Sequence, residues 1–450
     1  MTMKPLRNNR GAVLVIVAIS MVALLAVTGL AIDSGVGYGV KAKLNAALDA
    51  AAIAAARAVA GGDNDSERKA NAEAAGLKYF QANFPAGWLG ATPGTPAITA
   101  VHHPDGYWEI AASGSASVPT SFMRILGRNL LMVNAASAAI RRDLDMVLVI
   151  DCSGSLAPPY SPGETFGQVK DAAKTFVDRF ASGPGGDRLG LVTFASGAEL
   201  SVPIDKTSAR GFSKATFEGA IDALAVGGST ASAEAMRVAL NELDAVPAGL
   251  RSSLRVVVFF SDGAPNDVNA DFKTSGAPIR GDLYSEVEAG SGPARIFRHD
   301  RRNSSLGTHS ISQLPELGLD AIPLAGYNNQ RTLTTSGSAY QNSRCNVNKA
   351  ARNMVENVAN TARDNDIHVY TLGLGSRLND LEITFCSYGP EEFGANILRR
   401  LANANGRDGK PVADTLDEEQ PSGLYAFAAN ADELEAAFNQ IASDILRLTR

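Results

Sequence analysis

The chain has 450 residues, of which 45% are hydrophobic and 20% charged. This is an ordinary globular composition, with room for two or three domains and a large buried core. The formal net charge is −6, and no stretch carries the dense basic surface that phosphate binding requires, which argues against a nucleic-acid partner. Three Cys and five His, none in a zinc-ligand spacing, argue against a disulfide scaffold and against a zinc module.

The first predicted element is an apolar helix near the N-terminus. Residues Ala12 to Ile32 carry no charge, and a helix of that length spans roughly 30 Å, enough to cross the hydrocarbon core of a bilayer. A cleaved secretory signal is the alternative, but its apolar region is usually about 7–15 residues long and ends at a small-residue cleavage site. Here Asp33 follows without an AxA-like sequence. A retained transmembrane anchor is therefore the favoured interpretation.

The charges beside this helix predict its orientation. Lys4, Arg7 and Arg10 precede the apolar run, while Lys41 and Lys43 follow it at some distance. The excess of positive charge before the run predicts a cytoplasmic N-terminus, with the rest of the chain on the other side of the membrane.

Residues 34–140 are predicted to form a small α+β module. The alanine-rich segment 41–60 favours a helix, and a second helix is expected over 66–82 with Ser66 as its N-cap. From 97 to 140 the hydrophobic pattern becomes strand-like, with a hairpin turning at 104–106.

From Leu144 onward, apolar strands alternate with amphipathic helices. Strands are predicted over 146–150, 188–195, 200–204, 255–260 and 367–375, and helices over 165–181, 214–225, 231–243, 347–365 and 431–448. Near-continuous apolar strands in this alternation are typical of a mostly parallel sheet covered on both faces, so a doubly wound α/β domain is expected over 141–450. Between 266 and 344 the alternation breaks down, which predicts an insertion on the carboxyl edge of the sheet.

Oxygen-bearing side chains follow two of the predicted strands. Asp151, Ser153 and Ser155 come directly after one strand, Asp262 ends another, and GGSTAS, with Thr230, opens a predicted helix. A DxSxS spacing alone is weak evidence, because Asp and Ser are common in turns. The loops after parallel strands converge at one edge, however, near the point where the strand order reverses. An all-oxygen shell there suits Mg²⁺, with Mn²⁺ and Ca²⁺ as alternatives.

From about Leu144 to its end the chain resembles a VWA (integrin I-like) domain. DCSGS, Thr230 and SDG match the metal-ion-dependent adhesion site of that family. The family is built on a doubly wound, Rossmann-like sheet, and its site leaves one coordination position open for a carboxylate from a protein partner. The resemblance therefore implies a metal-dependent protein-binding role.

The resemblance also implies a role for each of the five residues. Ser153 and Ser155 would bind the ion directly, Asp151 and Asp262 would act mainly through water, and Thr230 would supply the remaining hydroxyl. The same loop offers two other hydroxyl groups, those of Ser229 and Ser232.

The front of the chain resembles the N-terminal segment of TadE/TadG-like proteins of tight-adherence (Flp) pilus assembly. The similar stretches are RNNRGAVLVIVAISMVALLAVTGLAIDSG, KLNAALDAAAIAAARA and WEIAASGSASVPTSFMRILG. The resemblance implies a single-pass protein of the bacterial inner membrane, with most of the chain in the periplasm and with pilus or envelope components as partners. Processed prepilins are cut after a glycine and carry Glu five residues later. After Gly11 that position is Ile16, which favours a permanent anchor.

The cysteines fit an exported protein. Cys345 opens a predicted helix and Cys386 lies shortly after the following strand. Helix and strand pack as neighbours, so a Cys345–Cys386 disulfide is plausible, and it would persist only in an oxidising compartment. Cys152, inside the predicted metal loop, is expected to be a small buried side chain.

Catalysis finds no support in the sequence, which has no histidine metal motif, no GxSxG and no GxxxxGK[ST]. The chain is therefore predicted not to be an enzyme. Two other binding roles stay open. One is a VWA protein of a different envelope complex. The other is a chelatase- or chaperone-type VWA partner of an ATPase, which would require this domain to lie in the cytoplasm.

Overall fold

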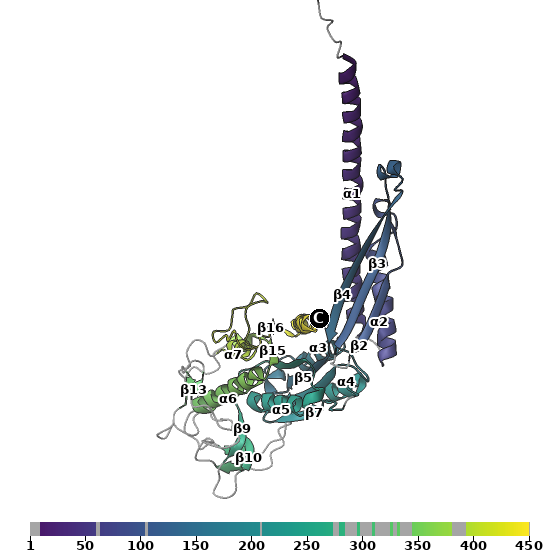
Figure 1. The fold of residues 1–450 in the computed structure, drawn as a ribbon. Coiled ribbons are helices and arrows are strands. Elements are labelled where there is room, and N and C mark those ends of the chain that lie inside the picture. The colour runs from purple at the N-terminus through teal and green to yellow at the C-terminus, as the bar shows by residue number, and fades with distance from the viewer. Residues whose placement is uncertain are drawn as a thin grey trace, which may run out of the picture. The chain divides into compact units, whose positions relative to one another are not determined.

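The computed structural model of the chain describes residues 10–59, 64–103, 107–207, 209–272, 279–283, 295–297, 308–310, 325–326, 331–333, 344–379 and 393–449. The chain divides into two compact units (Figure 1). The N-terminal unit contains residues 1–61 and 65–141, and the α/β unit contains residues 62–64 and 142–450.

One uninterrupted helix, α1 (Arg10–Ala58), joins the apolar run to the alanine-rich segment. The sequence predicted helix in both places but not across the glycines between them. Gly37 costs about 1 kcal/mol in a helix interior, yet it lets another segment approach closely, because a Cβ there would lie 2.3 Å from Leu131 Cδ2. Among the described helices, α1 is the one long and apolar enough to cross a membrane, and its large apolar side chains from Val13 to Leu30 are exposed.

The second half of α1 packs with α2 (Asp65–Asn83) on a four-stranded sheet. The strands are β1 (Thr92–Pro93), β2 (Ala97–His103), β3 (Tyr107–Pro119) and β4 (Leu130–Arg142). The predicted hairpin is confirmed, since β2 and β3 are antiparallel with His103 opposite Tyr107. The N-cap prediction is wrong, because α2 begins one residue before Ser66. Short 3₁₀ turns lie at η1 (Trp88–Gly90) and η2 (Met123–Leu126).

The α/β unit is built on a six-stranded sheet in the order β16-β15-β8-β5-β6-β7. Its strands are β5 (Leu144–Asp151), β6 (Arg188–Phe194), β7 (Ala198–Val202), β8 (Leu254–Ser261), β15 (Ile367–Leu374) and β16 (Tyr425–Ala428). All neighbours are parallel except β6 and β7. This confirms the expected mostly parallel, doubly wound sheet. The chain leaves β5 toward β6 on one side and later returns to β8 on the other, so the strand order reverses at β5.

Helices cover both faces of this sheet (Figure 1). One face carries α3 (Thr165–Val177), α4 (Lys214–Asp222) and α8 (Leu434–Leu448), and the other carries α5 (Ser232–Asp244), α6 (Arg344–Asp364) and α7 (Gly394–Leu401). Every residue of β5 and β8 is buried, as expected for strands covered on both sides. Helix α7 and strand β16 were not predicted from the sequence. Short 3₁₀ turns are η3 (Gly154–Leu156), η4 (Ala248–Leu250), η5 (Ser376–Asn379) and η6 (Ala431–Glu433).

The segment 266–344, predicted as an insertion without regular structure, begins with a hairpin that belongs to the core. β9 (Val268–Phe272) pairs antiparallel with β10 (Ile279–Leu283), and their apolar side chains join the hydrophobic cluster beneath α5 and α6. Further short strands are β11 (Arg295–Phe297), β12 (Thr308–Ser310), β13 (Ala325–Gly326) and β14 (Arg331–Thr332). Cys386 lies outside the described residues, so the Cys345–Cys386 disulfide stays a prediction.

Candidate metal site

The candidate site forms where β5 and β8 end at the carboxyl edge of the sheet. The two strands are parallel neighbours with Ile150 opposite Phe260, so Asp151 and Asp262 leave the sheet side by side. Asp151 is held in place from two directions: its Oδ1 accepts a hydrogen bond of 2.7 Å from the Ser153 backbone N–H, and its Oδ2 accepts one of 2.6 Å from the Ser261 hydroxyl. The central carboxylate is therefore fixed by its own loop and by the next strand.

The two serines of the DxSxS sequence reach toward the second carboxylate. Ser153 Oγ and Ser155 Oγ lie 3.0 Å apart, and Ser155 Oγ donates to Asp262 Oδ1 at 2.7 Å. Ser161 Oγ donates to the Ser155 carbonyl at 2.8 Å and steadies the loop. Three of the five predicted residues therefore form one continuous group of oxygen atoms, and Asp151 is joined to it through the Ser153 backbone N–H.

Thr230, the fifth predicted residue, comes from a loop that lies against the first one. The Gly154 N–H donates to the Gly228 carbonyl at 3.0 Å. Gly228 has a φ of +85°, and a Cβ there would lie 2.8 Å from Ser196 Oγ, so only glycine fits this turn. Thr230 itself is buried, and its hydroxyl lies 3.9 Å from the point where a Cβ on Gly263 would stand, next to Asp262.

The other two hydroxyls of this loop have different surroundings. Ser229 Oγ donates to Asp267 and lies 2.9 Å from Ser196 Oγ. Ser232 is the buried first residue of α5. The Ser229 hydroxyl is thus bonded to Asp267 and Ser196, whereas the Thr230 hydroxyl is the one that lies beside Gly263.

Burial leaves the site with negative charge that is poorly compensated. It raises the pKa of Asp151 from 3.8 to about 6. Burial, followed by the charge of Asp151, raises the pKa of Asp262 from 3.8 to about 7, while the Arg377 guanidinium acts in the opposite direction. Two carboxylates forced together in this way favour a proton or a cation between them. Within the described ranges no group of three or more His, Cys, Asp and Glu side chains could hold a metal ion, so any ion here would depend on the hydroxyls.

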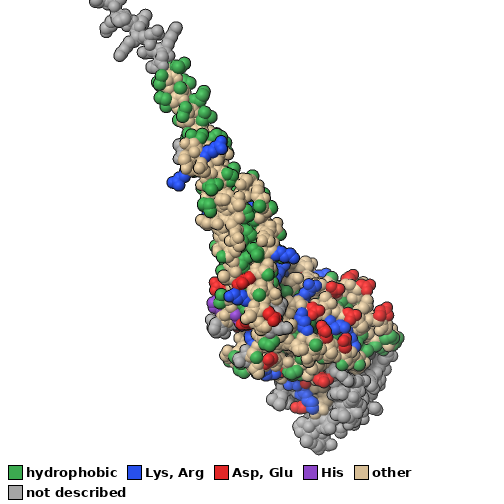
Figure 2. Space-filling model, turned by 90° about the vertical axis from the view of Figure 1, so that its right-hand side faces the viewer, with side chains coloured by type: hydrophobic (Ala, Val, Ile, Leu, Met, Phe, Trp, Pro, Cys, Tyr) green, Lys and Arg blue, Asp and Glu red, His purple; other side chains and the backbone are tan. Residues whose placement is uncertain are grey.

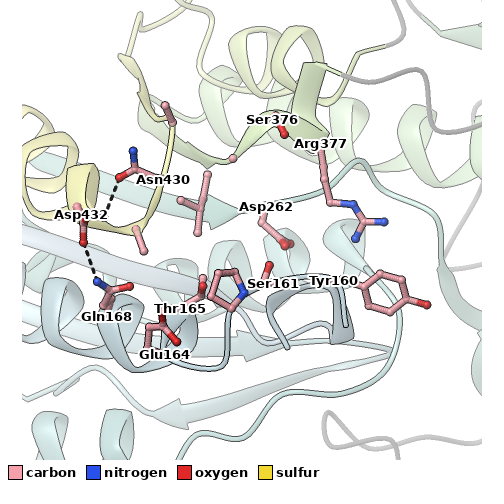
Figure 3. Close-up of a pocket in the computed structure, with 15 residues that line it drawn as sticks. Tyr160, Ser161, Glu164, Thr165, Gln168, Asp262, Ser376, Arg377, Asn430 and Asp432 are labelled. Atoms are coloured by element: carbon pink, nitrogen blue, oxygen red, sulfur yellow. Dashed lines mark hydrogen bonds between the residues drawn. The ribbon is translucent and has the colours of Figure 1, made fainter. Parts of the chain in front are cut away.

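A hollow of about 330 Å³ opens beside Asp262. Figure 3 shows Asp262 between two groups of side chains. On one side Gln168 donates to Asp432 at 2.8 Å. On the other, the Arg377 guanidinium lies 4.9 Å from the centre of the Tyr160 ring. The site therefore faces a polar hollow with an exposed cation at its rim.

Three residues that shape the site were not predicted from the sequence. Ser261 precedes Asp262 in the SDG sequence and holds Asp151. Asn266 Oδ1 accepts a 2.9 Å hydrogen bond from the Thr230 backbone N–H and positions its loop. Arg377 follows β15 in η5, and only its place after a predicted strand could have pointed to it.

Comparison with known proteins agrees with this architecture. The model of the von Willebrand factor type A domain matches residues 145–282. No curated protein sequence matches the chain significantly.

Solved structures show weak overall similarity. A von Willebrand factor type A protein from Catenulispora acidiphila is 12% identical with a TM-score of 0.35, over 78% of this chain and 50% of that one. The vWF domain of the type V pili tip protein Mfa5 from Porphyromonas gingivalis is 15% identical with a TM-score of 0.39. The match covers 69% of this chain and 98% of that domain. Proximal thread matrix protein 1 from the mussel byssus, with a zinc-occupied MIDAS motif, is 16% identical with a TM-score of 0.34, over 68% and 46%.

The first and third of these proteins are thus matched over half of their length or less, and similarity this low assigns no function. The family match covers the strands and loops that carry all five predicted site residues. The α/β unit of this chain contains a von Willebrand factor type A domain.

Proposed function

We propose that this domain binds a divalent cation, Mg²⁺ or alternatively Mn²⁺ or Ca²⁺, and through it a protein partner. Ser153, Ser155 and Thr230 would bind the ion directly, with Asp151 and Asp262 acting mainly through water. The donor set fits a hard cation because it consists only of oxygen. The observation that carries the proposal is the unbroken group from Ser153 Oγ through Ser155 Oγ to Asp262, with spacings of 3.0 and 2.7 Å.

The hollow is lined by three carboxylates, those of Glu164, Asp262 and Asp432, and by Arg377, so attraction of an acidic partner would depend on the ion and on Arg377. The ion would supply the positive charge that attracts a carboxylate from outside. Arg377 stands exposed at the rim, held over Tyr160, where its guanidinium can donate to the same carboxylate or to a neighbouring one. The role we propose is binding, because the serine, threonine and aspartate oxygens of the site suit a cation that is held in place.

The wider role we propose is in assembly or anchoring of Flp/Tad-type pili, with α1 as a single-pass anchor in the bacterial inner membrane. The resemblance of the first 140 residues to TadE/TadG-like proteins supports this assignment. Retention of the anchor is supported by α1 itself, because the apolar run continues without a break into the half of the helix that forms the core of the N-terminal unit. The basic residues before the run support a periplasmic α/β unit.

The test is partner capture from detergent-solubilised membranes, using the tagged full-length chain with Mg²⁺ or with EDTA. The proposal predicts captured envelope proteins that EDTA releases and that Asp262→Asn fails to retain. Asp171→Asn, an exposed carboxylate on α3, is the matched control and should retain them. Capture that is indifferent to both EDTA and Asp262→Asn would refute metal-dependent binding.

A further inference from the structure

The turn between β3 and β4 packs against the membrane-facing part of α1. This turn, residues 120–129 with η2 at its centre, belongs to the N-terminal unit, as α1 does. A Cβ on Gly29 would lie 2.5 Å from Phe122 Cβ, so the glycine lets Phe122 pack directly against the backbone of α1. Gly29 lies inside the uncharged run, about 5 Å along the helix from its end at Ile32.

Asp33, the first charged residue after the run, is used to hold this turn. Its carboxylate accepts three backbone hydrogen bonds: from Ser121 N–H at 2.9 Å, from Phe122 N–H at 2.9 Å and from Met123 N–H at 2.6 Å. Asp33 is only 5% exposed. Backbone donors that face lipid need a partner inside the protein. The Asp33 carboxylate is such a partner for three backbone N–H groups of the turn. Three backbone donors of the turn are therefore satisfied inside the protein, as an apolar environment would require.

The turn and the first residues of β4 present large apolar side chains outward. Ile125 is 80% exposed, Leu130 58% and Met132 57%. Arg124 and Arg128 are exposed beside them. Figure 2 shows basic side chains and apolar ones gathered next to the apolar helix. Exposed apolar patches of this kind mark interaction surfaces.

We propose that this turn is a second membrane contact, inserted into the interfacial layer of the bilayer beside α1. This inference rests on the proposed function, in which α1 is a membrane anchor. Three observations favour lipid as the occupant. The apolar side chains continue the apolar surface of α1, the turn reaches about 5 Å inside the run, which is the depth of interfacial segments, and Arg124 and Arg128 suit the phosphates of anionic lipids. The contact would give the N-terminal unit a second point of attachment to the membrane and would restrict its rotation about α1.

Tryptophan quenching by brominated lipid tests this. The full-length chain is reconstituted at high dilution in phosphatidylcholine–phosphatidylglycerol vesicles with or without bromine on the acyl chains. Emission is compared with that of the wild type, whose own tryptophans are Trp88 and Trp108. The inference predicts that the added emission of Ile125→Trp is blue-shifted and is largely lost with brominated lipid. Ile140→Trp, at the other end of β4 and 43% exposed, is the matched control and should keep its emission.

Leu24→Trp, within the apolar run, tests the membrane anchor separately from the proposed second membrane contact. If Leu24→Trp is quenched and Ile125→Trp is not, the anchor stands and the second contact is refuted. If neither is quenched, the anchor itself fails. A blue shift of Ile125→Trp without quenching would show a protein cover, such as a second copy of the chain, and would also overturn the lipid contact.

Discussion

At pH 8 without divalent cations, the Asp262→Asn variant is expected to be more stable than the wild-type chain, and Mg²⁺ is expected to remove most of this difference. Burial and the charge of Asp151 raise the pKa of Asp262 in the folded chain from 3.8 to about 7. When the pKa of a carboxyl group rises on folding, the free energy of unfolding of the chain falls as the pH rises from about 4 to about 7. Asparagine removes this loss, on the order of 4 kcal/mol in full, and keeps an acceptor for Ser155.

Magnesium should act in the opposite sense. Binding only to the folded wild type stabilises it by about 2.7 kcal/mol at an ion concentration 100 times the dissociation constant, and the variant should gain little. Calorimetric unfolding of the full-length chain in detergent, at pH 4 and pH 8 with and without Mg²⁺, measures all these differences. Near pH 4 the two chains should converge. A wild type that Mg²⁺ does not stabilise at pH 8, or a variant that gains as much as it does, would contradict the metal site.

The second large effect is expected at the opposite edge of the same sheet, for Arg188→Met. Arg188 is fully buried, and its Nη1 lies 3.2 Å from Asp145 Oδ1. The rest of its guanidinium donates to backbone carbonyl groups, those of Leu250, Asp205 and Thr207. Removing one partner from a buried pair typically costs about 3–5 kcal/mol. Asp145 keeps Arg210 Nη2 at 3.5 Å and two hydrogen bonds from Ser252, so the lower end of this range, about 3 kcal/mol, is expected. The free energy of unfolding should fall by that amount in the same calorimetric experiment.

Lys174→Met is the matched control, because Lys174 pairs at the surface with the exposed Asp171 and Asp222, and such pairs contribute about 1 kcal/mol or less. The stabilisation by Mg²⁺ should survive in Arg188→Met, since Asp145 begins β5 whereas Asp151 ends it. An Arg188→Met variant that unfolds like Lys174→Met would show that this pair does not hold the edge of the sheet.

The central sheet could be predicted because its strands are buried on both faces. MVLVI and RVVVFF are continuous apolar runs, and the structure buries every residue of both. Strand β16 was not predicted because it has only four residues, and helix α7 was not predicted because it has only eight residues. The hairpin β9–β10 has no regular apolar pattern, and its burial depends on contacts with α5 and α6 that the local sequence does not reveal.

The site was predictable to the extent that its residues follow strands. Asp151 and Asp262 end neighbouring strands, so topology alone brings them to one edge. The roles of Ser261 and Asn266 depend on hydrogen bonds between loops that are distant in sequence. The spacing of residues along the chain does not predict such hydrogen bonds. In the N-terminal unit, α1 runs without interruption through the glycines between its two predicted parts, and Gly37 leaves room for a neighbouring side chain.

The most direct measurement is electron paramagnetic resonance of Mn²⁺ added to the purified full-length chain near pH 8. If the oxygens of Ser153, Ser155 and Asp262 hold a divalent cation, the wild type will reduce the free-Mn²⁺ signal, Mg²⁺ will restore it, and Asp262→Asn will leave it close to that of the buffer. An unchanged signal with the wild type, or equal binding by the Asp262→Asn variant, would contradict the account.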